Sequence, residues 1–258
     1  MLGFNVLSGE RGIRTPDTVS RIHTFQACSF NHSDTSPKML WAAKIHKRPA
    51  LQTFDYTGLY KTFVAMNLDL AYQAYWEKAL PVETYLDDLL QAMPKDLEGM
   101  DRYLPINQQR VKRLLSRFQL NPEVEAACLN APQGSKWLIL NEHWCGDGAQ
   151  SIPVQAAMQR ASNGRLDIRV LFRDQNLELM DAHLTNGGRS IPMTLALTPD
   201  WTVGKTWGPR PAYAMDLVAR IKANPDLAHT YSEELHKWYA LNKQQAIQVE
   251  LAQSLLGL

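Results

Sequence analysis

Hydrophobic positions recur at helical spacing from residue 66 onward. Apolar side chains three or four residues apart predict helices over Leu68–Leu80, Val82–Met93 and Asn107–Phe118. Pro81 interrupts the first two because its ring is not tolerated inside a helix. A further helix is predicted to begin at Asn121-Pro122, since asparagine is a good N-cap and proline suits the first helical position. Residues 66–118 are therefore predicted to form a helical extension.

The pattern then alternates between short apolar runs and helical segments. The apolar runs predict strands at Lys136–Asn141, Leu166–Phe172, Met193–Leu197 and Val203–Trp207. Between and after them, helices are predicted at Gly148–Ala161, Leu177–Leu184 and Pro211–Ala223, with a long one at Tyr231–Leu255. Strands joined by helices and closed by a hairpin imply a mixed sheet covered on both faces. We predict an α/β domain over residues 119–258 that includes the long C-terminal helix.

Residues 1–65 show no sustained period of either kind. The stretch Gly9–Pro37 resembles a peptide that recurs at the start of unrelated predicted bacterial proteins, where it looks like translated non-coding DNA. We expect the natural start to be Met66. A disordered tail and a targeting arm are the alternatives.

Composition narrows the class of protein. The chain has 258 residues, of which 45% are hydrophobic and 21% charged, as in ordinary globular proteins. Its 27 basic and 26 acidic residues give a net charge of +1, so charge predicts no nucleic-acid partner and no membrane partner. No apolar run reaches the roughly 18 residues of a membrane helix. Three cysteines, an odd and low number, fit a reducing compartment, and we expect the cytoplasm.

The segment Leu138–Pro153 carries the candidate chemistry. An apolar strand runs into Trp144-Cys145-Gly146-Asp147, and a helix follows. Cys145 is thereby predicted in the first turn of a helix, where unpaired N–H groups and the helix dipole favour a thiolate. This placement predicts a depressed pKa for Cys145 and a nucleophilic role. The alternative is a small buried apolar residue, which is the usual environment of a free cysteine.

At these residues the chain resembles the thioredoxin superfamily. Trp144-Cys145-Gly146 matches the start of the redox motif, Pro153 follows the cysteine by eight residues, and Ile191-Pro192 precedes a strand. The resemblance covers residues 120–224 and implies that Pro192 is cis, lies against the active cysteine and helps to bind an extended substrate. The WCGD motif and the segment LMDAHLTNGGRSIP are similar to a bacterial group of thioredoxin-like proteins that carry an N-terminal helical extension.

Two departures from that family matter for function. Gly148 stands where the resemblance places the second motif cysteine, and Ile139 stands where it places a buried acid. Without a second thiol, a mixed disulfide on Cys145 has no internal group to resolve it. Cys28 and Cys128 are poor substitutes, because one lies in the N-terminal segment and the other is predicted on a packed helix face.

Other groups near the motif are candidates for substrate binding. The resemblance and the loop positions suggest Trp144, Gly146, Asp147, Arg189, Ile191 and Pro192. Arg189 would pair with a thiolate or an anionic substrate, or else is a solvated loop arginine. Asp147 would oppose a thiolate, and we favour a helix-capping role for it. Glu142 and His143 alternate along a strand, so at most one of them is expected to face the site.

These features favour single-cysteine thiol–disulfide exchange, with an external thiol as resolver. The partner would be a disulfide- or thiol-containing protein, or a small thiol. The alternative is a non-catalytic adaptor that binds an extended peptide in the cis-proline groove. Transfer of glutathione to small molecules is a third possibility, for which no pocket residues are identified. We expect no cofactor and no metal, since no phosphate loop and no pair of Cys/His with zinc spacing is present.

Overall fold

A computed structural model describes residues 72–258. The segment 1–65 and the expected start at Met66 both lie outside the described residues. Within the described part, no helix has the length and apolar character needed to cross a membrane.

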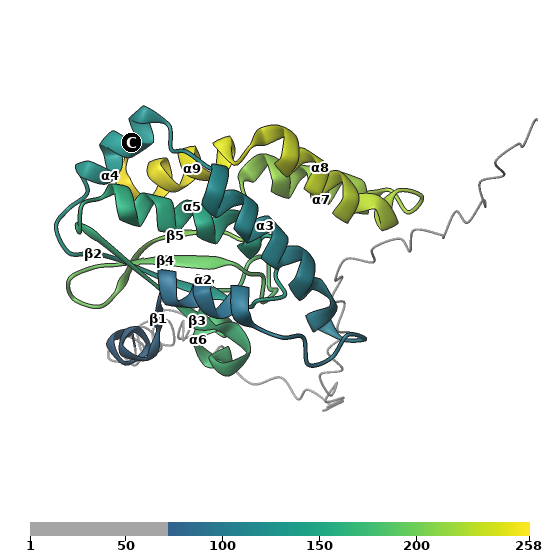
Figure 1. The fold of residues 1–258 in the computed structure, drawn as a ribbon, viewed down its shortest axis with the longest axis horizontal. Coiled ribbons are helices and arrows are strands. Elements are labelled where there is room, and N and C mark those ends of the chain that lie inside the picture. Colours follow the sequence, from purple (N-terminus) through teal and green to yellow (C-terminus); the bar gives the residue numbers. More distant parts are fainter. Residues whose placement is uncertain (1–71) are drawn as a thin grey trace, which may run out of the picture.

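A five-stranded mixed sheet forms the centre of the molecule, with strand order β1-β3-β2-β4-β5 (Figure 1). The strands are β1 (Leu80–Pro81), β2 (Ser135–Asn141), β3 (Leu166–Phe172), β4 (Met193–Leu197) and β5 (Val203–Trp207). β2 and β3 are parallel, and the other three pairings are antiparallel. The predicted mixed α/β sheet is confirmed.

Helices cover the sheet on both faces. They are α2 (Val82–Gln91), α3 (Leu104–Arg117), α4 (Pro122–Leu129), α5 (Gly148–Ala161), α6 (Leu177–Asp181), α7 (Ala212–Ala223), α8 (Tyr231–Asn242) and α9 (Gln245–Leu251). A helix also covers residues 72–78. Short turns of 3-10 helix lie at Met100–Tyr103, Arg173–Gln175 and Ala228–Thr230, and a π-helical turn at Ala252–Leu256.

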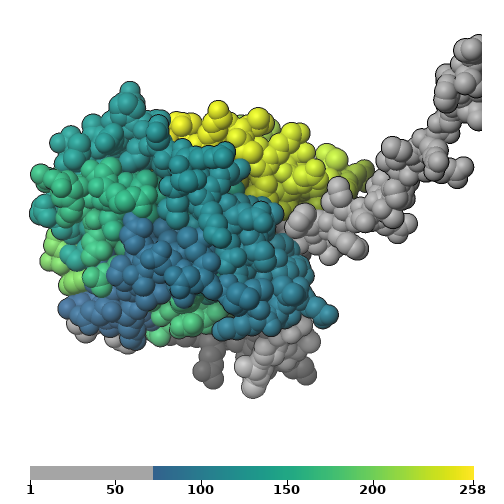
Figure 2. Space-filling view, viewed as in Figure 1, coloured from purple at the N-terminus to yellow at the C-terminus, as the bar shows by residue number. Residues whose placement is uncertain are grey.

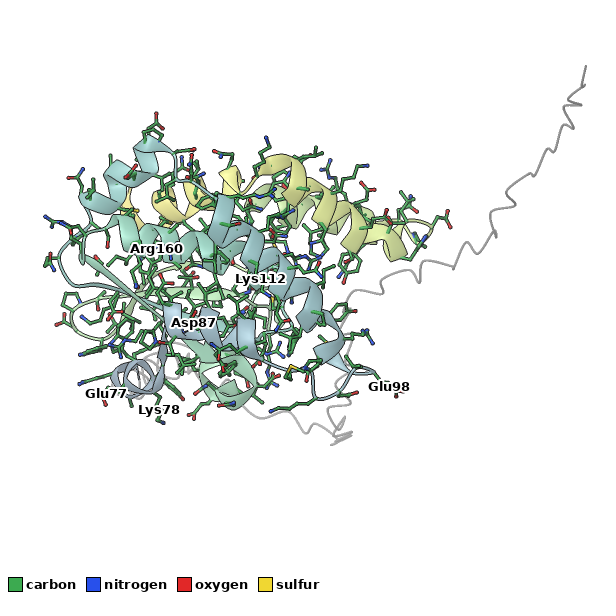
Figure 3. All side chains as sticks on the ribbon, in the orientation of Figure 1. Glu77, Lys78, Asp87, Glu98, Lys112 and Arg160 are labelled. Carbon is green, nitrogen blue, oxygen red and sulfur yellow. The ribbon has the colours of Figure 1, made fainter. Side chains whose placement is uncertain are left out.

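The central strand β2 is buried on both faces, which is why its sequence reads as a continuous apolar run. Successive side chains of a strand point to opposite faces. Trp137 and Ile139 accordingly join the core with α2, α3 and α5, whereas Leu138 and Leu140 join a second core with residues 72–79 and α6. Figure 3 shows Asp87, Lys112 and Arg160 on the outer surfaces of α2, α3 and α5.

The N-terminal extension packs directly onto the sheet. Leu80 and Pro81 form an edge strand that pairs with Val170 and Arg169 of β3, a strand that the helical pattern did not predict. Proline is tolerated there because an edge strand needs no N–H on its outer side. Val82 and Tyr85 of α2 belong to the same core as Ile139 of β2.

The C-terminal region is helical, but it is not the single helix predicted over Tyr231–Leu255. Lys243 and Gln244 both have left-handed backbone conformations, with φ of 50° and 62°, and they separate α8 from α9. The buried Gln244 donates a hydrogen bond to Oε1 of Gln150 on α5, at 2.9 Å. After this break, α9 buries Ile247 in the main core.

Candidate functional site

Cys145 lies in the loop that joins β2 to α5, two residues before the N-cap of that helix. Its Sγ atom accepts a hydrogen bond from the Gly148 N–H and donates one to the Ile191 carbonyl oxygen, both at 3.3 Å. The Ile191–Pro192 peptide bond is cis. Residues 46 positions apart are thus brought together at one sulfur atom, in the arrangement that the sequence resemblance implied.

The expected depression of the Cys145 pKa is wrong. Burial, together with a smaller contribution from the charge of Asp147, raises the pKa of this thiol to about 12. Hydrogen bonds from the Gly148 and Asp147 backbone and the charge of Arg210 act in the opposite direction and are smaller. Only 6% of the residue is exposed, so loss of hydration outweighs the favourable helix terminus.

Gly148, at the position of the missing second cysteine, faces the side chain of Asn141. A Cβ atom at position 148 would lie 2.6 Å from Cγ of Asn141 and closer still to both polar atoms of its carboxamide. Asn141 Nδ2 donates to Tyr85 Oη and to the Glu142 carbonyl oxygen, each at 2.8 Å. The carboxamide therefore occupies the space that a second motif thiol would need.

Ile139 is fully buried in the apolar core, at the position where the resemblance expected an acid. Thr194 of the neighbouring strand β4 pairs with Ile139. Thr194 Oγ1 donates a hydrogen bond to Gln155 Oε1 at 3.1 Å, so the polar contact beside Ile139 is between two uncharged side chains.

Asp147 is engaged in a buried polar cluster. Its Oδ2 atom accepts from Arg210 Nε at 3.1 Å, and its Oδ1 atom accepts from Tyr239 Oη at 2.8 Å. Asp147 is the N-cap residue of α5, as expected, but its side chain makes no capping hydrogen bond to that helix. Both carboxylate oxygens are taken by these partners from the C-terminal part of the chain.

Arg110 of α3 and His236 of α8 meet at Gly146, and sequence reasoning found neither. A Cβ atom at Gly146 would lie 3.2 Å from Arg110 Nη1 and 3.2 Å from His236 Cε1. Burial lowers the pKa of Arg110 to about 10 and the pKa of His236 to about 4, the latter with help from Arg110. Both residues lie on helices whose apolar spacing was interpreted as core packing. No local sequence signal indicated that these two polar side chains lie near Cys145.

Trp144 and Arg189 are linked through Arg173. The Arg173 guanidinium lies 4.9 Å from the Trp144 ring centroid and donates to the Arg189 carbonyl oxygen at 3.1 Å. The Arg189 side chain forms a bidentate ion pair with Asp181. Nε donates to Oδ1, and Nη2 donates to Oδ2 at 2.7 Å. The Arg189 guanidinium is therefore held by Asp181 and not by the Cys145 sulfur.

Glu142 and His143 have partners of their own. Glu142 accepts the Asp174 N–H at 2.8 Å, and burial raises its pKa to about 7. His143 Nε2 lies 3.3 Å from Asp88 Oδ2 but makes no hydrogen bond within residues 72–258, and its ring packs between those of Tyr85 and Phe172. Burial lowers the pKa of His143.

Cys128 is fully buried in α4, and burial raises the pKa of its thiol to about 11. Cys28 lies outside the described residues. Over residues 72–258, no group of three or more His, Cys, Asp or Glu side chains is arranged to hold a metal ion.

Comparison with known proteins relates the chain to one family. The family model described as Thioredoxin matches residues 93–224, about half of the chain. No curated protein matches the sequence. Among solved structures, the protein of unknown function PA1234 from Pseudomonas aeruginosa is 14% identical with a TM-score of 0.45, over 65% of this chain and 96% of its own. An HIV epitope-scaffold is 13% identical with a TM-score of 0.44, over 66% and 98%.

Proposed function

Because the chain belongs to the thioredoxin family, we propose that it carries out single-cysteine thiol–disulfide exchange at Cys145. The observation that carries this proposal is the position of the Cys145 sulfur. It sits at the N-terminal end of α5, within hydrogen-bond distance of the Gly148 N–H, and touches the cis Ile191–Pro192 segment.

The reaction has two steps at Cys145. The Cys145 thiolate attacks one sulfur of a substrate disulfide, so a Cys145–substrate disulfide forms and the other substrate sulfur leaves as a thiolate. An external thiol, such as glutathione, then attacks the substrate sulfur of that mixed disulfide, which releases the Cys145 thiolate and leaves the external thiol bonded to the second substrate half. A second external thiol attacks that disulfide, and the substrate half takes up a proton and leaves as a thiol. The two external thiols supply the two electrons and become one disulfide.

An external resolver is required by the surroundings of Cys145. The Asn141 carboxamide fills the space beside Gly148, and the remaining described thiol, Cys128, is fully buried in a different helix. Neither position offers a second sulfur to the mixed disulfide.

The resting thiol is protonated, since burial raises its pKa to about 12. The Ile191 carbonyl oxygen accepts the S–H hydrogen bond in this state. An extended substrate strand that paired with Ile191 would bring its own N–H to that carbonyl and displace the S–H donor. The sulfur would then keep only the Gly148 N–H, which stabilises a thiolate. Substrate binding and thiol activation are thereby coupled.

The substrate class is a disulfide in a protein segment that adopts an extended conformation, or a small-molecule disulfide. Both described cysteines are unpaired in the structure. An external thiol resolver and unpaired cysteines are both compatible with a reducing compartment, and we place the activity in the cytoplasm.

A glutathione-coupled assay tests this function. The full chain is incubated with reduced glutathione and a mixed disulfide of glutathione and a model peptide, and release of the peptide thiol is measured. Wild type and Cys128→Ser should release thiol at equal rates, whereas Cys145→Ser should fall to the uncatalysed rate. Full activity in Cys145→Ser would overturn the assignment.

The second candidate is a peptide-binding module without exchange activity, and the burial of the Cys145 thiol favours it. Under this candidate, Cys145→Ser would bind an extended peptide as tightly as wild type, and wild type would show no turnover with glutathione. Turnover that requires Cys145 excludes it.

A further inference from the structure

A half-buried pair of basic side chains lies next to Cys145. Arg110 and His236 converge on the backbone of Gly146, with a Cβ at that position 3.2 Å from Arg110 Nη1 and 3.4 Å from His236 Nε2. The surface of α3, in teal, adjoins that of the C-terminal helices, in yellow (Figure 2). Arg110, Gly146 and His236 each retain partial exposure, so a ligand from solvent can reach them.

The position of Arg110 is fixed by the fold. Its Nη1 atom donates to Asn107 Oδ1 at 2.9 Å, and Asn107 Nδ2 donates to the His143 carbonyl oxygen at 3.0 Å. Asn107 is fully buried. Its two hydrogen bonds connect the Arg110 guanidinium to the loop that carries Cys145.

The positive charge of Arg110 has no anion of its own. The nearby carboxylate of Asp147 already accepts hydrogen bonds from Arg210 and Tyr239 through both oxygens. Among residues 72–258, Arg110 makes no ion pair, and its hydrogen bond goes to the neutral Asn107. This half-buried guanidinium has lost hydration and gains only the charge of Asp147, which it shares with Arg210, so a further anion would compensate for the lost hydration.

His236 adds a second unsatisfied group to the same place. Its Nδ1 atom is buried and has no hydrogen-bond partner, while Nε2 faces Gly146. A neutral imidazole donates from one nitrogen, and a proton on Nε2 would let His236 donate to a ligand oxygen beside Gly146.

We propose that Arg110 and His236 form a carboxylate-binding subsite beside Gly146, which selects anionic disulfides or anionic resolving thiols for Cys145. The inference rests on the proposed function and adds that the substrate or the resolving thiol is negatively charged. Arginine recognises a carboxylate through paired N–H donors, and the imidazole N–H supplies a further donor. The ligand class is a small thiol or disulfide with free carboxylates.

Binding of S-methylglutathione tests the subsite without any redox step, since this probe has two carboxylates and no thiol. Calorimetric titration into the full-length chain should show a Kd that rises about tenfold in Arg110→Gln, as expected for one charged hydrogen-bonded contact. Arg110→Lys should recover part of the affinity because the charge remains. Arg113→Gln removes an exposed arginine from the same helix and should leave the Kd within about twofold of wild type. The diethyl ester of the probe, which lacks the carboxylate charges, should bind about as weakly to wild type as the acid does to Arg110→Gln.

Equal affinities of wild type and Arg110→Gln for the acid, or equal affinities of acid and ester for wild type, would overturn the subsite. Absence of binding at millimolar probe would do so as well. An unfolded Arg110→Gln protein would be recognised by circular dichroism, and the acid-to-ester comparison on wild type would then decide.

A kinetic comparison separates this inference from the proposed function. Modification of Cys145 is followed with anionic dithiobis(nitrobenzoate) and with neutral dithiodipyridine. A rate ratio that favours the anionic probe in wild type and falls about tenfold in Arg110→Gln supports the subsite. If Cys145 exchanges with both probes without a charge preference, the proposed function stands and the subsite is rejected. If S-methylglutathione binds through its carboxylates but no exchange occurs at Cys145, the subsite stands and the proposed function is rejected.

Discussion

The backbone of Gly148 lies against the carboxamide of Asn141, so closely that a Cβ atom on Gly148 would overlap the Asn141 side chain. Asn141 is in turn held by Tyr85 and by the Glu142 carbonyl. The loss of the second motif cysteine is therefore coupled to a polar side chain at the end of the preceding strand. A simple reversion at position 148 meets a steric barrier.

Gly148→Ala and Gly148→Cys should both destabilise the protein by about 1–3 kcal/mol, the usual cost of overpacking a buried site. Urea unfolding measures the change. Gly188→Ala is the matched control, because a Cβ there finds its nearest atom at an ordinary 3.5 Å, and it should stay within about 0.5 kcal/mol of wild type. Unchanged stability in Gly148→Ala would contradict the steric coupling.

Combining Gly148→Cys with Asn141→Ala should restore a dithiol. Removal of the carboxamide makes room for the introduced side chain, and oxidation should then form a disulfide between Cys145 and the introduced cysteine. Peptide mapping of the oxidised protein detects this bond. The single variant Gly148→Cys should form it less completely, and equal yields in the two variants would argue against Asn141 as the obstacle.

Alkylation of Cys145 by iodoacetamide should still be accelerating at pH 10, because the thiol pKa is raised to about 12 by burial and by Asp147. An ordinary thiol, with a pKa of about 8.5, would already have reached its plateau. Peptide-resolved mass spectrometry gives the rate for each cysteine. Cys128, with its own pKa raised to about 11 by burial, serves as the internal comparison. A plateau at Cys145 below pH 8 would contradict this account of the resting site.

Asp147→Asn should lower the stability of the protein and at the same time raise the reactivity of the Cys145 thiol. The change leaves the Arg210 guanidinium without its carboxylate, and breaking a buried pair of this kind costs about 3–5 kcal/mol. It also removes a charge that raises the Cys145 pKa, so alkylation of the folded protein at neutral pH should become faster.

The control for that variant is Asp181→Asn, which breaks the exposed ion pair with Arg189. Its cost should stay below about 1 kcal/mol, as for other surface pairs. Chemical denaturation at pH 7 measures both variants. Equal losses in the two would show that the Asp147–Arg210 pair is not effectively buried.

Glu142→Gln should change how stability depends on pH. Burial raises the folded-state pKa of Glu142 to about 7, whereas the unfolded value is near 4.3. Between these values the folded protein binds more protons than the unfolded chain, so Glu142 makes stability fall as pH rises. Removing that group should make stability rise more steeply, or fall less, from pH 4.5 to pH 7.

His236 acts in the opposite direction over much of the same range. Its folded-state pKa is lowered to about 4, so it makes stability fall as pH decreases from about 6.5. His236→Gln should therefore flatten the acid side of the profile while Glu142→Gln steepens it. Urea midpoints at half-unit pH steps test both signs, and parallel profiles for wild type and Glu142→Gln would contradict the assignment.

Local sequence patterns determined most of the secondary structure. The predicted bounds of α5, β3, β4 and β5 coincide with the observed ones, because alternating or helical apolar spacing and flanking turn residues act within a few positions of each other. The motif around Cys145 and the Ile191-Pro192 pair also pointed to the fold that the family match confirms.

Tertiary structure decided the chemistry of the site. Burial of Cys145 set its pKa against the expectation from the helix terminus alone. Arg110 and His236, 126 positions apart in sequence, meet at Gly146, and Gln244 bonds to Gln150 at the break between α8 and α9. Periodicity records which face of an element is apolar, but not which distant side chains meet there. Hydration loss and long-range pairing are properties of the packed molecule, so the residues that tune Cys145 emerge only when the chain is folded.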